Sequence, residues 1–325
     1  MKLSTDQIRS LTVGAVHMEE QEGILSFFKC TKQQSDAWFA LNKGLGERSL
    51  TTTGIRLDFH TDSKHLTFTP ASPGKYEVDV DGLLRCQFHA GSEEFPVGQP
   101  ISLPLCGPLG EIKEEVRVTL YLPSHSVGSL SAVELDEGAK TCRHSFDRKW
   151  LMIGDSITQG WDSQFDSLSY AYRVSRFFNA ESVIQGIGGA RFHESTFDAA
   201  LPFDPDVVSV AYGTNDFNHY KTKEEMRAHT RSFLEQVAKT YEGKSIFVIS
   251  PIWRADSKER PLGTFEEARA VVIQEAERLG LIHIDGLELV PPLPEFFADK
   301  YLHPHDMGFG VYAEQLISRL QAYLS

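Results

Sequence analysis

Residues 150–160 read WLMIGDSITQG, and this stretch decides how the second half of the chain folds. Its first four residues are apolar and form a short run that is typical of a buried strand. The run ends at Gly154, and a loop that contains Ser156 follows it. In a parallel sheet, ligands and reacting groups gather beyond the carboxyl ends of the strands. We therefore look for the chemistry of this chain at the end of this strand and of its neighbours.

The rest of this half alternates between strand and helix patterns. Further strands are predicted at residues 181–187, 206–212, 245–252 and 281–285. Amphipathic helices are predicted near residues 167–178, 223–241, 264–280 and 308–324. Strands that alternate with helices predict a mostly parallel sheet with helices on both of its faces, which is an α/β fold of three layers.

Before about residue 145 the hydrophobic pattern has a period of two. Ile55, Leu57 and Phe59 alternate with polar residues, and similar runs continue as far as Leu122. Turn residues separate the runs, and Asp81-Gly82 is a signal for a tight hairpin. This pattern predicts an all-β, antiparallel, jelly-roll-like sandwich.

We therefore expect two domains, a β-sandwich at residues 1–145 and an α/β domain at residues 146–325. The first 45 residues give no clear pattern, although the apolar residues at 38–41 indicate that they pack against something.

Composition excludes several classes of protein. Of the 325 residues, 41% are hydrophobic and 24% are charged, which is typical of a globular protein with a large core. The formal net charge of −13 argues against a nucleic-acid partner, because phosphate binding needs clustered lysine and arginine. The N-terminus lacks the apolar core of a secretory signal. No apolar run approaches the roughly 18 residues of a membrane span.

The cysteines are widely spaced and form no C-x-x-C pair; they are Cys30, Cys86, Cys106 and Cys142. This spacing predicts neither zinc nor a disulfide framework, and we expect a reduced, cytoplasmic protein. The sequence shows no other metal-ligand spacing and no phosphate-binding loop with lysine, so we expect no metal and no cofactor. It leaves the oligomeric state open.

Four polar loops stand out in the α/β half. Three of them directly follow predicted strands, and the fourth lies near the C-terminus; they are residues 154–160 (GDSITQG), 186–189 (GIGG), 213–216 (GTND) and 299–304 (DKYLHP). Together they supply a serine, backbone amides, an asparagine and a histidine. These are the groups that acyl transfer needs, namely a nucleophile, oxyanion donors and a base.

The four blocks resemble those of the SGNH hydrolases, also called GDSL-type esterases and lipases, and they occur in that family's order. The resemblance rests on GDSIT, GIGGA, GTND and LHPHD, and it covers roughly residues 148–325. It implies a flavodoxin-like three-layer fold and a serine esterase or acyl hydrolase. No G-x-S-x-G elbow surrounds Ser156, which disfavours the α/β-hydrolase fold.

The resemblance also implies roles for single residues. Ser156 would attack the acyl carbonyl, and His303 would take the serine proton. The backbone N–H groups of Ser156 and Gly189 and the side-chain amide of Asn215 would hold the oxyanion. Gly188 is the alternative to Gly189 as the second backbone donor, because the resemblance fixes the register of this loop only to within one residue.

The acid departs from the family's usual pattern. Many members place an aspartate three residues before the histidine, where this chain has Lys300. Asp299 lies one residue further away, and we favour it as the group that orients the imidazole of His303. Alternatively, a backbone carbonyl does so, which would leave a Ser–His dyad.

The order of the domains resembles that of some carbohydrate acetylesterases. It implies a small-molecule ester as substrate, in which a short acyl group is attached to a saccharide. Of the short acyl groups, acetyl is the one that the resemblance favours. Trp161, Trp253 and Arg254 follow strand ends and are candidate substrate contacts, although Trp161 could equally cover the core and Arg254 pair with a surface acid. The alternatives are an acyltransferase, a lipase or lysophospholipase-like activity, and an inactive carbohydrate-binding protein that would be expected to lack part of the catalytic set.

Overall fold

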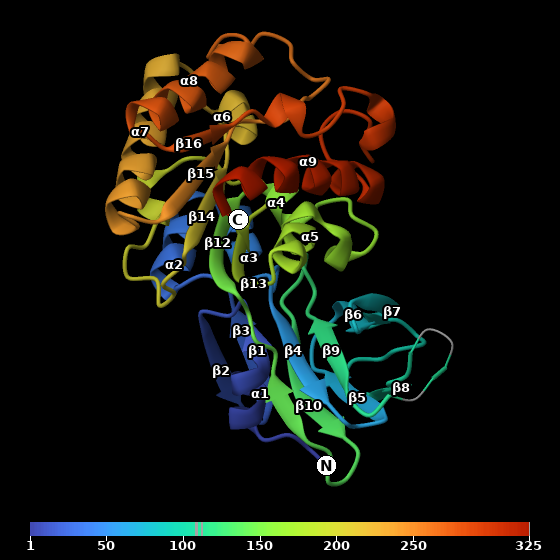
Figure 1. Cartoon of the computed structure of the whole chain (residues 1–325). Coiled ribbons are helices and arrows are strands. Elements are labelled where there is room, and N and C mark those ends of the chain that lie inside the picture. The colour runs from blue at the N-terminus through green and yellow to red at the C-terminus, as the bar shows by residue number, and fades with distance from the viewer. Residues whose placement is uncertain (108–109, 112, 325) are drawn as a thin grey trace.

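The computed structural model describes residues 1–107, 110–111 and 113–324. Figure 1 shows a β-rich part and an α/β part joined end to end, with the N-terminus at the far tip of the β-rich part. The order of these parts along the chain is the one that the change of hydrophobic period predicts.

Two antiparallel sheets form the β-rich part. The first contains β1 (Thr12–Val13), β4 (Arg56–Thr61), β9 (Val116–Tyr121), β6 (Gly74–Val80) and β7 (Leu83–Ala90) in this order, with β11 (Thr141–Arg143) also paired to β4. The second contains β2 (His17–Gln21), β3 (Ile24–Phe28), β10 (Ser129–Leu135), β5 (His65–Pro70) and β8 (Ile101–Pro104). Apolar side chains of both sheets form one buried cluster, so the predicted antiparallel sandwich is confirmed.

The predicted hairpin at Asp81-Gly82 is also present. Val80 pairs with Leu83 across the turn between β6 and β7. The φ angles are 54° at Asp81 and 77° at Gly82. Two consecutive positive φ angles are typical of the type I′ turn, whose twist matches that of the strands, and Asp-Gly is a preferred pair for it.

The α/β part is built on a parallel sheet. Its strands are β13 (Ala180–Gly186), β12 (Arg148–Gly154), β14 (Val207–Ala211), β15 (Ser245–Ile249) and β16 (Ile282–Ile284), in this spatial order. The sequence order of the strands across the sheet is therefore 2-1-3-4-5, as in flavodoxin-like folds. The predicted strand at residues 245–252 ends early, because Pro251 has no backbone N–H to donate to a neighbouring strand.

Helices cover both faces of this sheet. They include α5 (Tyr170–Phe177), α7 (Lys223–Thr240), α8 (Phe265–Arg278) and α9 (Asp306–Leu324). Trp150 and Met152 of β12 pack in the cluster of α5 and α9, whereas Leu151 and Ile153 pack in that of α7 and α8. Alternate residues of a strand point to opposite faces, so the continuous apolar run of β12 is what a sheet buried on both sides requires. The predicted three-layer α/β/α fold is confirmed.

The remaining helical segments are short. They are α1 (Thr5–Leu11), α2 (Lys32–Leu41), α3 (Lys43–Ser49), α4 (Ser156–Gln159), α6 (Thr214–His219), and the 3-10 segments Asp166–Leu168, Glu194–Thr196, Gly286–Glu288 and Pro294–Phe296. None of the helices described above combines the length and the apolar character needed to cross a membrane.

Helices α2 and α3 precede most of the sandwich in sequence but pack on the α/β part. In Figure 1 these two blue helices lie beside the parallel strands of the α/β part. Trp38 of α2 and Leu45 of α3 are buried in the same cluster as Ile187 and Phe192, which follow β13. An N-terminal segment thereby reaches the loop after the second strand of the sheet.

We predict that replacing Trp38 by alanine lowers the free energy of unfolding by about 3–5 kcal/mol, because the side chain is only 2% exposed and its loss leaves a cavity. Phe39 is the matched control, since it is adjacent on α2 and 40% exposed. Denaturant titration of both variants measures the difference. Equal losses for Trp38→Ala and Phe39→Ala would contradict the docking of α2 on the α/β core.

Candidate active site

The turn after β12 places Ser156 at the start of α4. Asp155 is the N-cap of this helix, and its side chain accepts a hydrogen bond of 2.9 Å from the Ile157 N–H. Burial raises the pKa of Asp155 to about 7. A Cβ atom on Gly154 would lie 1.9 Å from the Thr158 hydroxyl oxygen. The turn therefore needs glycine at this position to bring the serine to the edge of the sheet.

A chain of hydrogen bonds connects Ser156, His303 and Asp299. Ser156 Oγ lies 3.0 Å from His303 Nε2, and His303 Nδ1 lies 2.7 Å from Asp299 Oδ2. Lys300, the extra residue between acid and base, has a φ of 67°. This left-handed residue turns the chain so that an aspartate four positions before the histidine still reaches its ring. The group at His303 Nδ1 is thus a carboxylate rather than a backbone carbonyl.

The second oxygen of Asp299 is held by the loop itself. Oδ1 accepts hydrogen bonds from the backbone N–H groups of Tyr301, Leu302 and His303, at 3.0, 2.8 and 3.1 Å. Burial raises the pKa of Asp299, but these bonds and the one from His303 outweigh it, so the pKa lies below its ordinary value. The carboxylate is ionised at neutral pH and fixed in position. Asp162 is a second carboxylate nearby, with Oδ2 3.7 Å from His303 Nδ1.

Two side chains hold the peptide at Gly188. Its N–H donates to Gln159 Oε1 at 2.7 Å, and its carbonyl oxygen accepts from Arg48 Nη1 at 3.0 Å. The N–H of Gly189 makes no hydrogen bond to another residue in the described parts of the chain. Gly189 has a φ of 83°, which favours glycine. Of the two competing glycines, Gly189 therefore has the N–H that remains available.

Asn215 lies in the first turn of α6, directly after β14. Its Nδ2 donates to the carbonyl oxygen of Ala190 at 2.9 Å, which leaves its second amide hydrogen for another acceptor. Asp216 is fully buried and accepts from the Phe192 N–H at 3.0 Å. Burial raises the pKa of Asp216 to about 7. These two side chains tie the loop after β14 to the loop after β13.

A cavity of about 240 Å³ opens at this point. Its described lining is Arg48, Ser156, Trp161, Gly188, Gly189, Asn215, Leu302 and His303. The structure thus brings together the nucleophile, base and oxyanion candidates of the sequence analysis, and it places Trp161 among them. Arg48 and Leu302 were not foreseen. Arg48 belongs to the N-terminal segment whose packing the hydrophobic pattern did not reveal.

Trp253 and Arg254, two expected substrate contacts, are not part of this lining. Trp253 packs against Phe297, with ring centroids 5.0 Å apart. Arg254 is 2% exposed; it donates to the Thr214 carbonyl oxygen at 3.0 Å and pairs with Asp256 at 3.2 Å. Its guanidinium therefore holds the first residue of α6.

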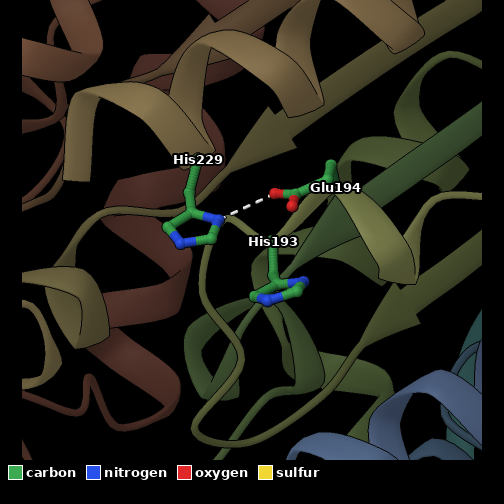
Figure 2. Close-up of side chains that lie close together, drawn as sticks. All are labelled: His193, Glu194 and His229. Atoms are coloured by element: carbon green, nitrogen blue, oxygen red, sulfur yellow. Dashed lines mark hydrogen bonds and ion pairs between the residues drawn. The ribbon is translucent and has the colours of Figure 1, made fainter. Parts of the chain in front are cut away.

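Two groups of side chains in the described residues have the composition of metal ligands. In the first, His229 Nδ1 bonds Glu194 Oε2 at 2.7 Å, and the rings of His193 and His229 stack 4.7 Å apart at 22° (Figure 2). Ring lone pairs lie in the ring planes, so stacked imidazoles need to rotate before both can ligate one ion. The second group is Asp162, Asp299 and His303, in which Nδ1 already bonds Asp299.

Residues 152–310 match the GDSL-like lipase/acylhydrolase family. A search of curated proteins found no match. Among solved structures, the salicylyl-acyltransferase SsfX3 from a tetracycline biosynthetic pathway matches with a TM-score of 0.83 and 22% identity, over 99% of this chain and 97% of that one.

Two further structures share both parts of the fold. A GDSL-like lipase from Bacteroides ovatus matches with a TM-score of 0.73 and 16% identity, over 97% of this chain and 96% of that one. A family two carbohydrate esterase from Cellvibrio japonicus matches with a TM-score of 0.67 and 14% identity, over 100% and 98%. At these identities the likeness is one of fold. The family match is what assigns the α/β part, residues 152–310, to the GDSL-like lipase/acylhydrolase family, and the chain is accordingly an enzyme of the esterase and acylhydrolase class.

Proposed function

We propose that this enzyme hydrolyses short acyl esters, acetyl esters first, through an acyl-serine intermediate on Ser156. The observation that carries the proposal is the Ser156–His303–Asp299 hydrogen-bond chain at the wall of the cavity. A hydroxyl bonded to an imidazole, which is itself oriented by a carboxylate, is the arrangement that activates serine as a nucleophile.

In the first half of the reaction Ser156 Oγ bonds to the carbonyl carbon of the ester, and its proton passes to His303 Nε2. The tetrahedral intermediate carries the negative charge on the former carbonyl oxygen. When it collapses, the bond to the alkoxy group breaks and the alcohol leaves with the proton from Nε2. Asp299 stays ionised; it holds the imidazole in position and stabilises its charged form.

In the second half water replaces the alcohol. His303 Nε2 accepts a proton from water as its oxygen bonds to the acyl carbon, and the same proton then returns to Ser156 Oγ as the carboxylic acid leaves. In both halves the oxyanion would accept hydrogen bonds from the N–H groups of Ser156 and Gly189 and from the free amide hydrogen of Asn215. Donors that are already in place need no reorganisation when the charge develops.

The size of the cavity supports a small acyl group. A volume of about 240 Å³ lies below the roughly 300–1,000 Å³ of sites for drug-sized ligands. For the alcohol part we propose a saccharide, because Trp161 offers an aromatic wall and because the carbohydrate esterase from Cellvibrio japonicus shares the same two-part architecture.

Acyl transfer to an alcohol is the second candidate. The similar fold of an acyltransferase favours it, and the chemistry differs only in whether water or an alcohol attacks the acyl-serine. A transfer product formed in the presence of a sugar acceptor, in excess over free acid, would favour this candidate over hydrolysis.

The direct test is an ester panel in which acetylated xylose, glucose and glucosamine are compared with 4-nitrophenyl esters from acetyl to decanoyl. We expect turnover of the acetyl esters at pH 7–8 and a loss on the order of 10⁶ in kcat for Ser156→Ala. Circular dichroism would establish that the variant is folded. A preference for long chains would contradict the acetylesterase proposal, and activity retained by the variant would disqualify Ser156.

We predict that Asp299→Asn lowers kcat by a factor on the order of 10⁴, because an amide at this position would donate to Nδ1 and stabilise the wrong imidazole tautomer. Asp162→Asn is the matched control, since Asp162 is more exposed and its carboxylate is 3.7 Å from the same nitrogen. We expect less than a tenfold loss for the control. If the two variants were equally impaired, the assignment of the acid to Asp299 would be wrong.

Replacing Asn215 by alanine should lower kcat about 10²–10³-fold with little change in KM, because the lost hydrogen bond forms to the oxyanion and not to the ground-state ester. Steady-state kinetics with a 4-nitrophenyl ester measure both constants. A rise in KM at unchanged kcat would instead identify Asn215 as a residue that binds substrate only.

A further inference from the structure

Arg48 is the one described lining residue of the cavity with a fixed charge. Its companions there are a serine, a tryptophan, two glycines, an asparagine, a leucine and a histidine. It enters from α3, in the N-terminal segment, and is half-buried. The whole chain has a formal net charge of −13, so a cation that lines the same cavity as Ser156 is not simply part of a basic surface.

Among the residues that the structure describes, the contacts of Arg48 include no counterion for its charge. Nη1 donates to the Gly188 carbonyl oxygen at 3.0 Å, and the guanidinium carbon lies 5.9 Å from the centroid of the Trp161 ring. Within the described residues no carboxylate lies within 4.0 Å of Arg48, whereas the buried Arg254 and Arg269 each have such a partner. A guanidinium has five N–H groups, so most of them remain for a ligand.

Holding the Gly188 peptide does not require a positive charge. Gln159 fixes the N–H of the same residue through a neutral amide oxygen, and a neutral donor would serve the carbonyl oxygen equally well. What a guanidinium adds is charge and a planar set of donors that matches a carboxylate with two parallel hydrogen bonds.

Arg48 is also held firmly in place. Its backbone carbonyl oxygen accepts a hydrogen bond of 3.0 Å from Lys29 Nζ, which donates in addition to the hydroxyls of Thr51 and Thr53. Its side chain is fixed at one end by Gly188 and along one side by Trp161. A binding group that is already ordered loses little conformational entropy when it meets its ligand.

We propose that Arg48 forms an anion subsite beside the nucleophile and that the preferred substrates are esters that carry a carboxylate within its reach. This inference rests on the proposed esterase function and narrows its substrate class. An acylated saccharide with a carboxylate group has the required chemistry. Arg48 then determines specificity, and the oxyanion remains with the three donors described above.

The test uses two pairs of esters that differ only in one charge. In the first pair the charge is on the leaving group, with 4-acetoxybenzoate against its methyl ester. In the second pair the charge is on the acyl group, with the mono-4-nitrophenyl ester of terephthalate against the corresponding methyl 4-nitrophenyl diester. The rigid ring of terephthalate keeps the free carboxylate of the monoester from attacking its own ester group. Each pair yields a ratio of kcat/KM, anionic over neutral, for every variant, so differences in intrinsic reactivity cancel.

We expect Arg48→Gln to lower this ratio about 10–100-fold in at least one pair. This is the range expected for the loss of one charge-assisted hydrogen bond, since about 1.4 kcal/mol corresponds to a factor of ten. Glutamine keeps a donor for Gly188, and Arg48→Lys, which keeps the charge, should retain part of the ratio. Lys43→Gln removes an exposed charge from the same helix and should leave the ratio unchanged. If Arg48→Gln lowered kcat/KM equally for anionic and neutral esters, Arg48 would act only on the Gly188 loop and the proposal would be overturned.

Binding separates this inference from the proposed function. Calorimetry with Ser156→Ala and 4-acetoxybenzoate should show at least tenfold weaker binding when Arg48→Gln is added, with no such change for the methyl ester. If this dependence holds but no ester is hydrolysed by the wild type, the esterase proposal falls and the anion subsite stands. If hydrolysis is robust and binding does not depend on Arg48, the subsite falls and the esterase proposal stands.

Discussion

The site depends on the parallel pairing of β12 with β13 and β14. In this register Gly154 lies opposite Gly186 on one side and Ala211 on the other, so the three strands end at one level. The strand order reverses at β12, and loops that leave neighbouring strands in opposite directions open a crevice at such a point. Glycine is required at position 186, since a Cβ atom there would lie 2.4 Å from the backbone nitrogen of Gln159. The sheet thus sets the distance between the nucleophile and the amides of the second loop.

Buried polar contacts connect this crevice to the sandwich and to the N-terminal segment that contains α2 and α3. Gln159, the last residue of α4, bonds Gly188 with its oxygen, and its nitrogen donates to the Ser124 carbonyl oxygen at 2.8 Å. Lys29 orders the end of α3, and Arg48 reaches back to the same Gly188. Buried polar groups of this kind are stable only when their partners are in place. The β-rich half therefore takes part in shaping the cavity, although the reacting groups all come from the α/β half.

Periodicity and motif order were sufficient for the fold and for most of the site. The period of two before residue 145, the strand–helix alternation after it and the four blocks identified both architectures and most, but not all, of the residues that meet in the cavity. Arg48 could not be foreseen, because its place depends on the docking of α2 and α3, and short helices with mixed faces carry little periodic signal. The prediction that Arg254 contacts substrate failed for a different reason. Arg254 does follow a strand end, but its side chain turns inward to Thr214 and Asp256. Asp299 reaches His303 across one extra residue because Lys300 adopts the left-handed conformation. A non-glycine residue seldom adopts this conformation, so the sequence favoured the contact without establishing it.

The proposed chemistry requires that Ser156 is the nucleophile and that His303 activates it. A fluorophosphonate probe reacts covalently with an activated serine, and peptide mass spectrometry locates the modified residue. We expect close to one label per chain, on the peptide that contains Ser156, in the wild type and almost none in His303→Ala at the same exposure. Labelling of another residue, or labelling of Ser156 that is equally fast without His303, would contradict it.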